Sequence, residues 1–182
     1  KVAIMAKKIM LIAGEYSGDL LAEYFIQQWP SEHQAEFYGI AGDLAKLQGM
    51  NLLMSYHTLA VTGFIEVLQQ FKSIAYALNL VKKTLVTQRP DLLVLIDYPG
   101  FNLKVAKFAK SLNIKILYLN PPQVWAWNAK RIEAIREYVD HTLLLLPFEQ
   151  DFYQKHKVKA TLIPHPLLNR CHPITNTKKK EL

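Results

Sequence analysis

The chain has 182 residues, of which 51% are hydrophobic, and its 22 lysine and arginine residues outnumber 15 aspartate and glutamate residues, giving a formal net charge of +7. This length and composition predict a single globular domain with a sizeable core. Stretches without charge, such as Ser73–Val81, are too short to cross a bilayer, which excludes a transmembrane helix. A single cysteine, Cys171, excludes an internal disulfide, and no Cys/His spacing around it predicts a metal site.

The N-terminal segment KVAIMAKKIM leads directly into a strand pattern and lacks the basic, apolar and cleavage regions of a signal peptide. The sequence therefore predicts a cytoplasmic protein, with Met5 as the first residue of the fold. Lysines spread along the whole chain favour attraction to an anionic surface, whether phospholipid, a phosphorylated ligand or nucleic acid. A solvated surface without any partner explains the same charge equally well.

Short runs rich in valine, isoleucine and leucine alternate with segments of helical period. This alternation predicts an α/β fold with a doubly wound, Rossmann-like parallel sheet. The expected strands are Lys8–Ala13, Glu36–Ile40, Asn51–Met54, Leu92–Asp97, Lys115–Leu119, Thr142–Leu146 and Thr161–Pro164. The expected helices are Gly18–Gln28, Phe64–Thr87, Phe101–Leu112, Ala129–Val139 and Phe148–Lys155.

Two of these helices carry further signals. Gly18–Gln28 follows Ser17, a good N-cap residue, and ends before Pro30. The long helix Phe64–Thr87 has an apolar stripe at helical spacing, formed by Phe64, Val67, Leu68, Phe71, Ile74, Ala75, Leu78, Val81 and Leu85. Beyond residue 168 the apolar period is lost and the chain ends in a lysine run, so we expect one domain over residues 5–168 and a linker stub or tail over 169–182.

Ligands of an open parallel sheet bind outside the carboxyl ends of its strands, which makes the turns after strands the candidate sites. The turn AGEYSGD, Ala13–Asp19, has two glycines and leads into a helix N-terminus whose free N–H groups can face a ligand. Its acidic residues argue against a phosphate, and a capped strand-to-helix turn is the alternative.

In IDYPGFN, Ile96–Asn102, Asp97 follows four apolar strand residues, where a partly desolvated carboxylate can accept a proton from an attacking hydroxyl. An aspartate that only caps the next helix is equally compatible with this pattern.

Two further turns combine prolines with chemically distinctive side chains. The segment NPPQVWAWN, Asn120–Asn128, has Trp125 and Trp127, which offer flat apolar surfaces suited to a sugar or a lipid. Burial of one of these tryptophans in the core is the alternative. The segment IPHPL, Ile163–Leu167, holds His165 between two prolines, a setting in which histidine is more often structural than catalytic.

In this order and at these distances, the segments resemble the lipid-A-disaccharide synthase family. The family's A-G-E-x-S-G-D turn is present in full as Ala13–Asp19, and its G-I-x-G follows as Gly39–Gly42. Its L-A-V-M-G-F-x-E-V-L segment appears as Leu59–Leu68, with Thr62 in place of methionine. Its I-D-x-P-D-F-N appears as Ile96–Asn102 and its V-W-A-W as Val124–Trp127. Its L-P-F-E-x-x-F-Y appears as Leu146–Tyr153 and its H-P-L as His165–Leu167.

The resemblance implies the N-terminal domain of a GT-B glycosyltransferase, an inverting enzyme of lipid A biosynthesis that uses no metal or other cofactor. The family transfers a diacylglucosamine unit from its UDP derivative to the 6-hydroxyl of diacylglucosamine 1-phosphate and releases UDP. It implies that this domain binds the lipid acceptor, that a C-terminal domain binds the UDP-sugar donor, and that nucleic acid is not a partner. The implied location is peripheral, on the anionic inner face of the inner membrane of a Gram-negative bacterium.

The resemblance also assigns roles to individual residues. Asp97 corresponds to the family's proposed general base, in agreement with its position after a strand. The substrate-binding residues that it implies are Gly14, Glu15, Ser17, Gly18, Asp19, Gly63, Phe64, Glu66, Asn102, Gln123, Trp125, Trp127 and His165. The helix Phe64–Thr87 corresponds to the membrane-facing region, and its second face suits that role with Ile65, Tyr76, Leu80 and Val86 beside Lys72, Lys82 and Lys83. Simple burial of this helix on the sheet is the alternative.

The sequence departs from the family pattern in several places. Gly100 stands where an aspartate is usual, Pro121-Pro122-Gln123 replaces S-P-S, Asn128 replaces an arginine, and Pro164 replaces a glycine. Polar and charged groups around the expected acceptor site are therefore missing. The resemblance implies a UDP-binding domain after the His165–Leu167 segment, and residues 169–182 are too short to form one, so we expect this chain alone not to transfer sugar. A non-catalytic or vestigial lipid-binding domain from a truncated gene is the alternative function.

Overall fold

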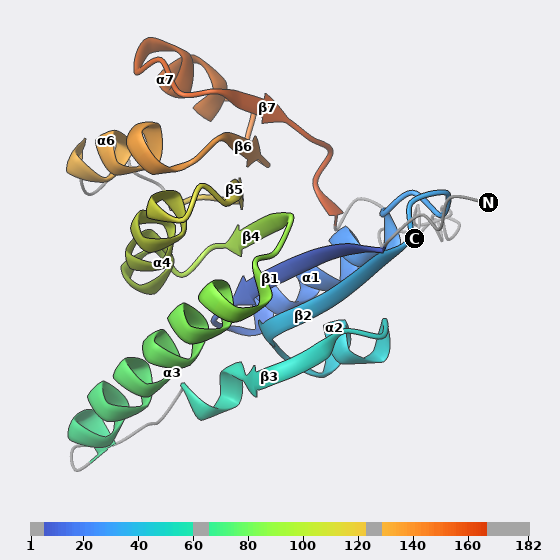
Figure 1. Ribbon diagram of the computed structural model, residues 1–182. Helices are drawn as coiled ribbons and strands as arrows, with labels where there is room; N and C mark the ends of the chain where they lie inside the picture. The colour runs from blue at the N-terminus through green and yellow to red at the C-terminus, as the bar shows by residue number, and fades with distance from the viewer. Residues whose placement is uncertain (1–5, 60–65, 123–128, 167–182) are drawn as a thin grey trace, which may run out of the picture.

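The computed structural model describes residues 6–59, 66–122 and 129–166, which form a parallel sheet with helices on both faces (Figure 1). The sheet has seven strands in the order β3-β2-β1-β4-β5-β6-β7. Their bounds are β1 (Lys7–Ala13), β2 (Ala35–Ala41), β3 (Asn51–Ser55), β4 (Leu92–Ile96), β5 (Lys115–Leu119), β6 (His141–Leu144) and β7 (Ala160–Leu162). All seven predicted strands are confirmed, with ends displaced by two residues at most.

The strand order reverses between β1 and β4, because β2 and β3 extend to one side of β1 while β4 to β7 extend to the other. In register, Ile9 of β1 lies beside Phe37 of β2 and Leu92 of β4. Residues Ile9–Ala13 are fully buried, because helices cover this central strand on both faces. This explains the continuous apolar run, and the doubly wound fold places its switch point at the carboxyl ends of β1 and β4.

The five predicted helices are all present, and within the described ranges two short helical elements accompany them. The bounds are α1 (Tyr16–Gln27), α2 (Asp43–Leu47), η1 (Tyr56–Thr58), α3 (Glu66–Gln88), α4 (Pro99–Ser111), α6 (Ala129–Tyr138) and α7 (Glu149–Lys155). Two buried clusters lie on opposite faces of the sheet. One joins α3, α4, α6 and α7 to one face, and the other joins α1 and α2 to the opposite face.

The prediction for the start of α1 was wrong. The helix begins at Tyr16, with Glu15 in the extended N-cap position, so Ser17 lies inside the first turn and does not cap it. Its hydroxyl instead donates a hydrogen bond of 2.5 Å to the Glu15 carboxylate. Ser17 and Glu15 therefore face the same side of the turn, at the carboxyl edge of the sheet.

The apolar stripe predicted for the long helix was only partly correct. Val81 and Leu85 of the predicted stripe are fully buried, whereas Phe71 is 69% exposed and Ala75 is exposed as well. Ala77, which the stripe did not include, is fully buried. Figure 1 shows the reason, since the first turns of α3 project beyond the sheet and only its second half lies over the strands. Among the described residues, no helix combines the length and the apolar character needed to cross a membrane.

Candidate functional site

The turns that follow the strands meet at the carboxyl edge of the sheet, as parallel pairing requires. Gly14 and Glu15 follow β1, Asp97 follows β4, Asn120 follows β5 and His165 lies beyond β7. The parallel sheet thus brings together residues that are far apart in the sequence, such as Ser17 and His165, which line the same hollow. Gly63, Phe64, Gln123, Trp125 and Trp127 lie outside the described residues, and Glu66 is the first residue of α3.

The turns after β1 and β4 are in direct contact through Gly14 and Tyr98. A β-carbon placed on Gly14 would overlap the Tyr98 ring, so only glycine allows the ring to lie there. The ring also stacks on Phe101 of α4, with 5.7 Å between the ring centroids. Position 14 therefore contributes to the site by letting the two turns approach each other closely.

Asp97 and Tyr98 have φ angles of 47° and 44°, which place two consecutive residues in the left-handed region. Residues other than glycine rarely adopt this conformation, so the surroundings must stabilise it. The Asn102 side-chain amide donates to the carbonyl oxygens of Ile96 at 3.1 Å and of Asp97 at 2.8 Å. The Tyr118 hydroxyl donates to the same Asp97 carbonyl at 2.8 Å. These two buried side chains fix the backbone from which the Asp97 carboxylate projects.

The protonation states of this cluster follow from burial and from neighbouring charges. Burial, followed by the charge of Asp97, raises the pKa of the Tyr118 hydroxyl well above its usual value, so the hydroxyl stays protonated and donates. Burial also raises the pKa of the Asp97 carboxyl, the Glu15 carboxylate raises it further, and the hydrogen bond from the Tyr98 N–H opposes both. A carboxylate with a raised pKa is a stronger base than an exposed one.

Two hollows lie side by side at this edge and share Asn120, whose φ is 50°. One has a volume of about 310 Å³ and is lined by Asp97, Asn120, Pro121, Pro122, Arg131, Leu146 and Glu149. The other has a volume of about 190 Å³, is mostly apolar, and is lined by Ser17, Leu20, Leu21, Asn120, Leu145, His165 and Pro166. The first can hold a polar group against the Asp97 carboxylate, and the second places Ser17 and His165 on the other side of Asn120.

Asp19 and Gly18 have surroundings of a structural kind. The Asp19 side chain is 1% exposed, and its carboxylate accepts hydrogen bonds from the backbone N–H groups of Gly42, Leu44 and Ala45 at 2.8, 3.0 and 3.1 Å. These bonds hold the start of α2, a helix that the sequence analysis missed. Gly18 is buried, and a β-carbon there would lie 3.1 Å from that of Ala13. The substrate-binding role of both residues stays a prediction.

Sequence reasoning missed Tyr118, Asn120, Arg131 and Glu149 as members of the site. Asn120 could have been found, since it directly follows a strand in the same way as Asp97. Arg131 lines the larger hollow from α6, and Glu149 is 2% exposed at the start of α7. Glu149 is the glutamate of the L-P-F-E-x-x-F-Y match, which could have singled it out. The position of Arg131 carries no such signal, because nothing in the sequence shows which side of its helix faces the sheet edge.

Within the described ranges, no three His, Cys, Asp or Glu side chains are grouped so that they could hold a metal ion.

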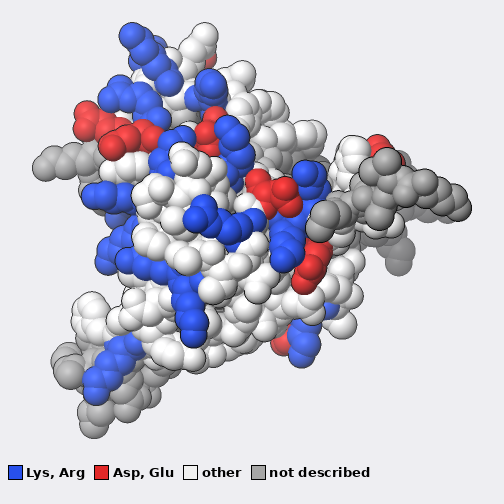
Figure 2. Space-filling view, in the orientation of Figure 1, with Lys and Arg blue, Asp and Glu red and all other residues white. Residues whose placement is uncertain are grey.

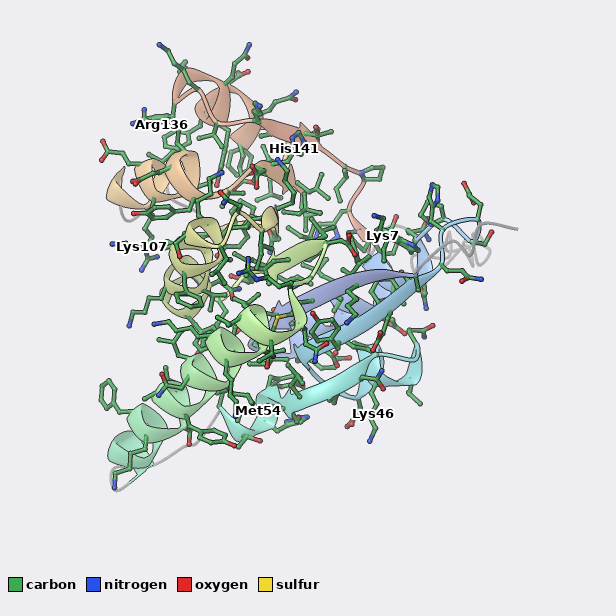
Figure 3. All side chains as sticks on the ribbon, viewed as in Figure 1. Lys7, Lys46, Met54, Lys107, Arg136 and His141 are labelled. Carbon is green, nitrogen blue, oxygen red and sulfur yellow. The ribbon has the colours of Figure 1, made fainter. Side chains whose placement is uncertain are left out.

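Lysine and arginine side chains are spread over the face seen in Figure 2, with acidic side chains among them. Figure 3 shows the same spread, with Lys46 on α2, Lys107 on α4 and Arg136 on α6. The positive charge is therefore distributed over several elements.

Solved structures with the same arrangement identify the class of domain. A UDP-N-acetylglucosamine 2-epimerase matches with a TM-score of 0.61 and 10% identity, over 88% of this chain and 48% of that chain. UGT73P12 of Glycyrrhiza uralensis, in complex with glycyrrhetinic acid 3-O-monoglucuronide, matches with a TM-score of 0.58 and 10% identity, over 90% of this chain and 49% of that chain. At such low identity the likeness is one of fold, and it defines a Rossmann-like domain of the GT-B type.

Sequence relatives identify the family within that class. The family profile described as lipid-A-disaccharide synthetase matches residues 9–182. The lipid-A-disaccharide synthase of Coxiella burnetii is 43% identical over 168 residues, which cover 92% of this chain and 45% of the relative. Lipid-A-disaccharide synthase 1 of Legionella pneumophila is 38% identical over 167 residues, covering 91% and 44%. The chain belongs to the lipid-A-disaccharide synthase family, and it spans about half the length of the curated relatives it matches.

Proposed function

We propose that residues 5–168 form the acceptor-binding domain of a lipid-A-disaccharide synthase, with residues 169–182 as a linker. The reaction joins a diacylglucosamine unit from UDP-2,3-diacylglucosamine to 2,3-diacylglucosamine 1-phosphate and releases UDP. Family membership supports this reaction. The nucleotide would be bound by the part of the family's length that this chain does not span.

The observation that carries the proposal is the position of Asp97. Its carboxylate lies at the switch point of the sheet, lines a hollow of about 310 Å³, and has a pKa raised by burial and by Glu15. In the proposed step, Asp97 takes the proton of the acceptor's 6-hydroxyl while that oxygen attacks the anomeric carbon of the donor. The bond from that carbon to the UDP oxygen breaks, UDP leaves with the electron pair, and the configuration is inverted.

The surface of α3 supports the further proposal that this domain lies on an anionic membrane. Phe71 and Tyr76 are 69% and 63% exposed, and Val86 is 48% exposed. Lys72 and Lys83 are also exposed on this helix, whereas Lys82 is partly buried, with its ammonium group 5.3 Å from the centroid of the Phe108 ring. Exposed aromatic side chains beside lysines suit binding at the headgroup level, on the inner face of a bacterial inner membrane. Ile65 lies outside the described residues.

The test uses a chimera in which residues 1–168 precede the C-terminal half of the Coxiella burnetii relative. We expect it to release UDP and to form the disaccharide, measured by coupled UDP detection and by mass spectrometry. Asp97→Asn should lower turnover by about 10²- to 10⁴-fold, the usual range for losing a general base. Asp91→Asn is the matched control, because Asp91 precedes the same strand at its opposite end and is exposed. Full turnover by Asp97→Asn would remove the general-base assignment, and an inactive chimera with intact lipid binding would favour a non-catalytic domain.

A further inference from the structure

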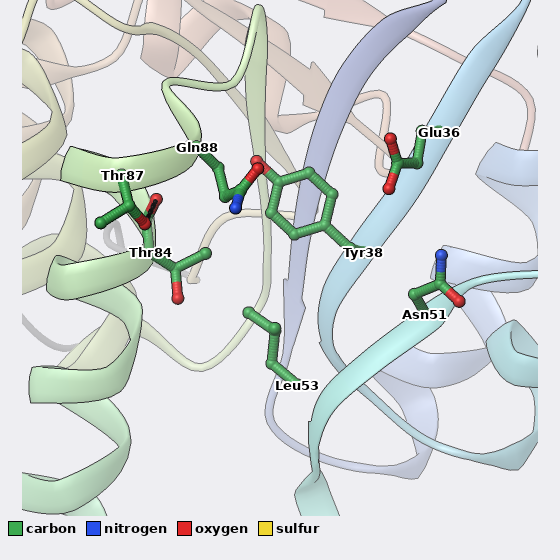
Figure 4. A pocket seen from close by; sticks show the side chains of 7 residues that line it. All are labelled: Glu36, Tyr38, Asn51, Leu53, Thr84, Thr87 and Gln88. Atoms are coloured by element: carbon green, nitrogen blue, oxygen red, sulfur yellow. Dashed lines mark hydrogen bonds between the residues drawn. The ribbon is translucent and has the colours of Figure 1, made fainter.

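A third hollow lies at the opposite edge of the sheet, where β2 and β3 begin and α3 ends (Figure 4). Its volume is about 260 Å³, and its walls are Glu36 and Tyr38 of β2, Asn51 and Leu53 of β3, and the last turn of α3 at Thr84–Gln88. The hollow exists because the edge strand β3 is not covered by α3, which leaves Leu53 37% exposed. It is separated from Asp97 by the full length of the sheet.

The Tyr38 hydroxyl is the buried group that this hollow leaves without a partner. Tyr38 is 6% exposed, and its hydroxyl has no hydrogen-bond partner among the described residues. Figure 4 shows its ring crossing the hollow from β2 toward α3, with Gln88 beside the hydroxyl end. Buried hydroxyl groups without partners are uncommon in folded proteins, and each calls for an explanation such as a ligand.

The other polar groups of the hollow are mainly hydrogen-bond acceptors. The Thr84 and Thr87 hydroxyls donate to the carbonyl oxygens of Leu80 and Lys83, at 2.9 and 3.1 Å, which leaves their oxygen lone pairs to accept. The Gln88 carbonyl oxygen already accepts from the Lys8 ammonium group at 3.1 Å, so its NH₂ group is left to donate. A ligand rich in hydroxyl or amine hydrogens would complement this set.

The electrostatic environment favours a positive charge on that ligand. Glu36 is the one charged side chain among the lining residues, and it forms no ion pair within the described part of the chain. The Lys8 ammonium group lies behind Gln88, to which it donates, and it does not neutralise Glu36 by an ion pair. The hollow also lies at the carbonyl end of α3, where the helix dipole is negative and no basic residue occupies the last turn. Burial, Glu36 and Asp91 together raise the pKa of Tyr38 to about 12, in keeping with a negative local potential.

We propose that this hollow is a binding site for a small ammonium compound that carries hydroxyl groups, of the amino-sugar class and of monosaccharide size. The ammonium group would lie against Glu36 and the end of α3. The ligand's hydroxyls would donate to Asn51 and the threonine oxygens, and the Tyr38 hydroxyl would gain a partner when Gln88 turns aside. The site is independent of Asp97, since the two lie at opposite edges of the sheet.

The test is a titration of the ¹⁵N-labelled 182-residue chain, followed through its backbone amide signals. D-glucosamine at about pH 6, where its amine is protonated, is compared with D-glucose, which has the same ring without the charge. We expect saturable shifts around residues 36–38, 51–53 and 84–88 at millimolar glucosamine. Binding of glucose should be about tenfold weaker, as the loss of one charge-assisted hydrogen bond predicts.

Variants separate the two parts of the proposal. Glu36→Gln should abolish the preference for glucosamine, whereas Glu32→Gln, an exposed acid outside the hollow, should leave it unchanged. Tyr38→Phe should weaken the binding of both sugars. If Tyr38→Phe does not fold, Gln88→Leu on the exposed last turn of α3 tests the same loss of binding. The absence of saturable shifts at this edge, or shifts confined to the turns after β1 and β4, would overturn the site. Equal effects of Glu32→Gln and Glu36→Gln would overturn the charge argument.

Discussion

The Tyr118 hydroxyl lies 2.8 Å from the carbonyl oxygen of Asp97, and this bond ties strand β5 to the turn that follows β4. Asn102 donates to the same carbonyl oxygen, so two side chains from different elements hold one peptide group. The carbonyl is on the backbone of the proposed general base. Its hydrogen bonds therefore set the direction of the carboxylate without touching the carboxylate itself.

Removal of these bonds should weaken both the fold and the site. Asn102→Ala leaves two buried carbonyl oxygens with fewer partners and opens a small cavity, so the free energy of unfolding should fall by about 2–4 kcal/mol. Tyr118→Phe removes one hydrogen bond and should lower it by about 1 kcal/mol. Urea denaturation of the 182-residue chain measures both values. Equal losses for the two variants would contradict the unequal numbers of bonds that the residues make.

The contact between Gly14 and Tyr98 predicts a difference between two glycines. Gly14→Ala should lower the free energy of unfolding by about 1–3 kcal/mol, because its methyl group overlaps the Tyr98 ring. Gly100→Ala, in the first turn of α4, meets no atom within 4 Å and should be neutral or stabilising by up to about 1 kcal/mol. The double variant Gly14→Ala with Tyr98→Ala should lose less stability than the sum of the two single variants. Strict additivity would show that the two residues do not interact.

The three hydrogen bonds to Asp19 predict that this residue stabilises α2. Asp19→Ala removes the acceptor of three backbone N–H groups, two of them buried, and should destabilise the chain by about 2–4 kcal/mol. Asp43→Ala is the matched control, because Asp43 is an exposed acid in the first turn of α2 and should change stability by about 0.5 kcal/mol. Thermal unfolding followed by circular dichroism distinguishes the two. A mild effect of Asp19→Ala would leave its carboxylate free for the predicted role in substrate binding.

The raised pKa of Asp97 predicts a pH dependence with a definite sign. The proposed base acts as a carboxylate, so turnover of the chimera should fall as the pH drops through the raised pKa, above the ordinary value near about 4. Glu15→Gln removes a negative neighbour and should move this acidic limb to lower pH. A rate–pH profile measures the displacement, and movement to higher pH would contradict the electrostatic role of Glu15.

The raised pKa of Asp97 also affects stability, with the opposite sign from the lowered pKa of a salt-bridged aspartate. Because the folded state binds the proton more tightly than the unfolded chain, ionisation of Asp97 opposes folding at pH values above the folded pKa. Asp97→Asn should therefore stabilise the chain at about pH 7, and the gain should shrink as the pH falls toward the ordinary carboxyl range. Denaturation at several pH values tests this, and a gain that is independent of pH would rule out the titration of Asp97 as its cause.

The exposed aromatic side chains of α3 predict membrane attachment. Phe71→Ser with Tyr76→Ser should reduce binding to vesicles of anionic phospholipid by about tenfold or more, since each buried aromatic ring contributes on the order of 1.5–3 kcal/mol. Leu47→Ser is the control, because Leu47 is 80% exposed on α2, on the opposite face of the sheet. Co-sedimentation with vesicles measures the loss. Equal losses for both changes would show that binding does not use α3.

Much of the fold was predictable because hydrophobic patterning reflects burial directly. The runs at Ile9–Ala13 and Leu93–Ile96 are buried on both faces of the sheet, so their lack of alternation was informative. The position of Asp97 followed from the same pattern, since a polar residue after such a run must lie at the edge of the sheet. The reaction was predicted from the family resemblance, because hydrophobic patterning carries no information about chemistry.

The features that were missed depend on contacts between distant segments. α2 is five residues long and is held by Asp19, which lies 24 positions before its first residue, so no local period announces it. Phe71 fitted the apolar stripe of α3, but where a helix leaves the sheet is a tertiary property. The contribution of Tyr118 depends on a left-handed turn at Asp97, and left-handed conformations of residues other than glycine have no reliable sequence signature.

The strand order also determines when the nascent chain can fold. Strand β1 pairs with β4, so Ile9 must wait for Leu92, and every pairing in the sheet is parallel and requires a crossover. The centre of the sheet cannot close on the ribosome until the chain has been synthesised as far as Ile96 and that residue has left the exit tunnel. Pairings of such long sequence separation fold slowly. Until then the edge of the apolar strand β1 that pairs with β4 remains open, which makes this stage of synthesis the one at which a chaperone would bind.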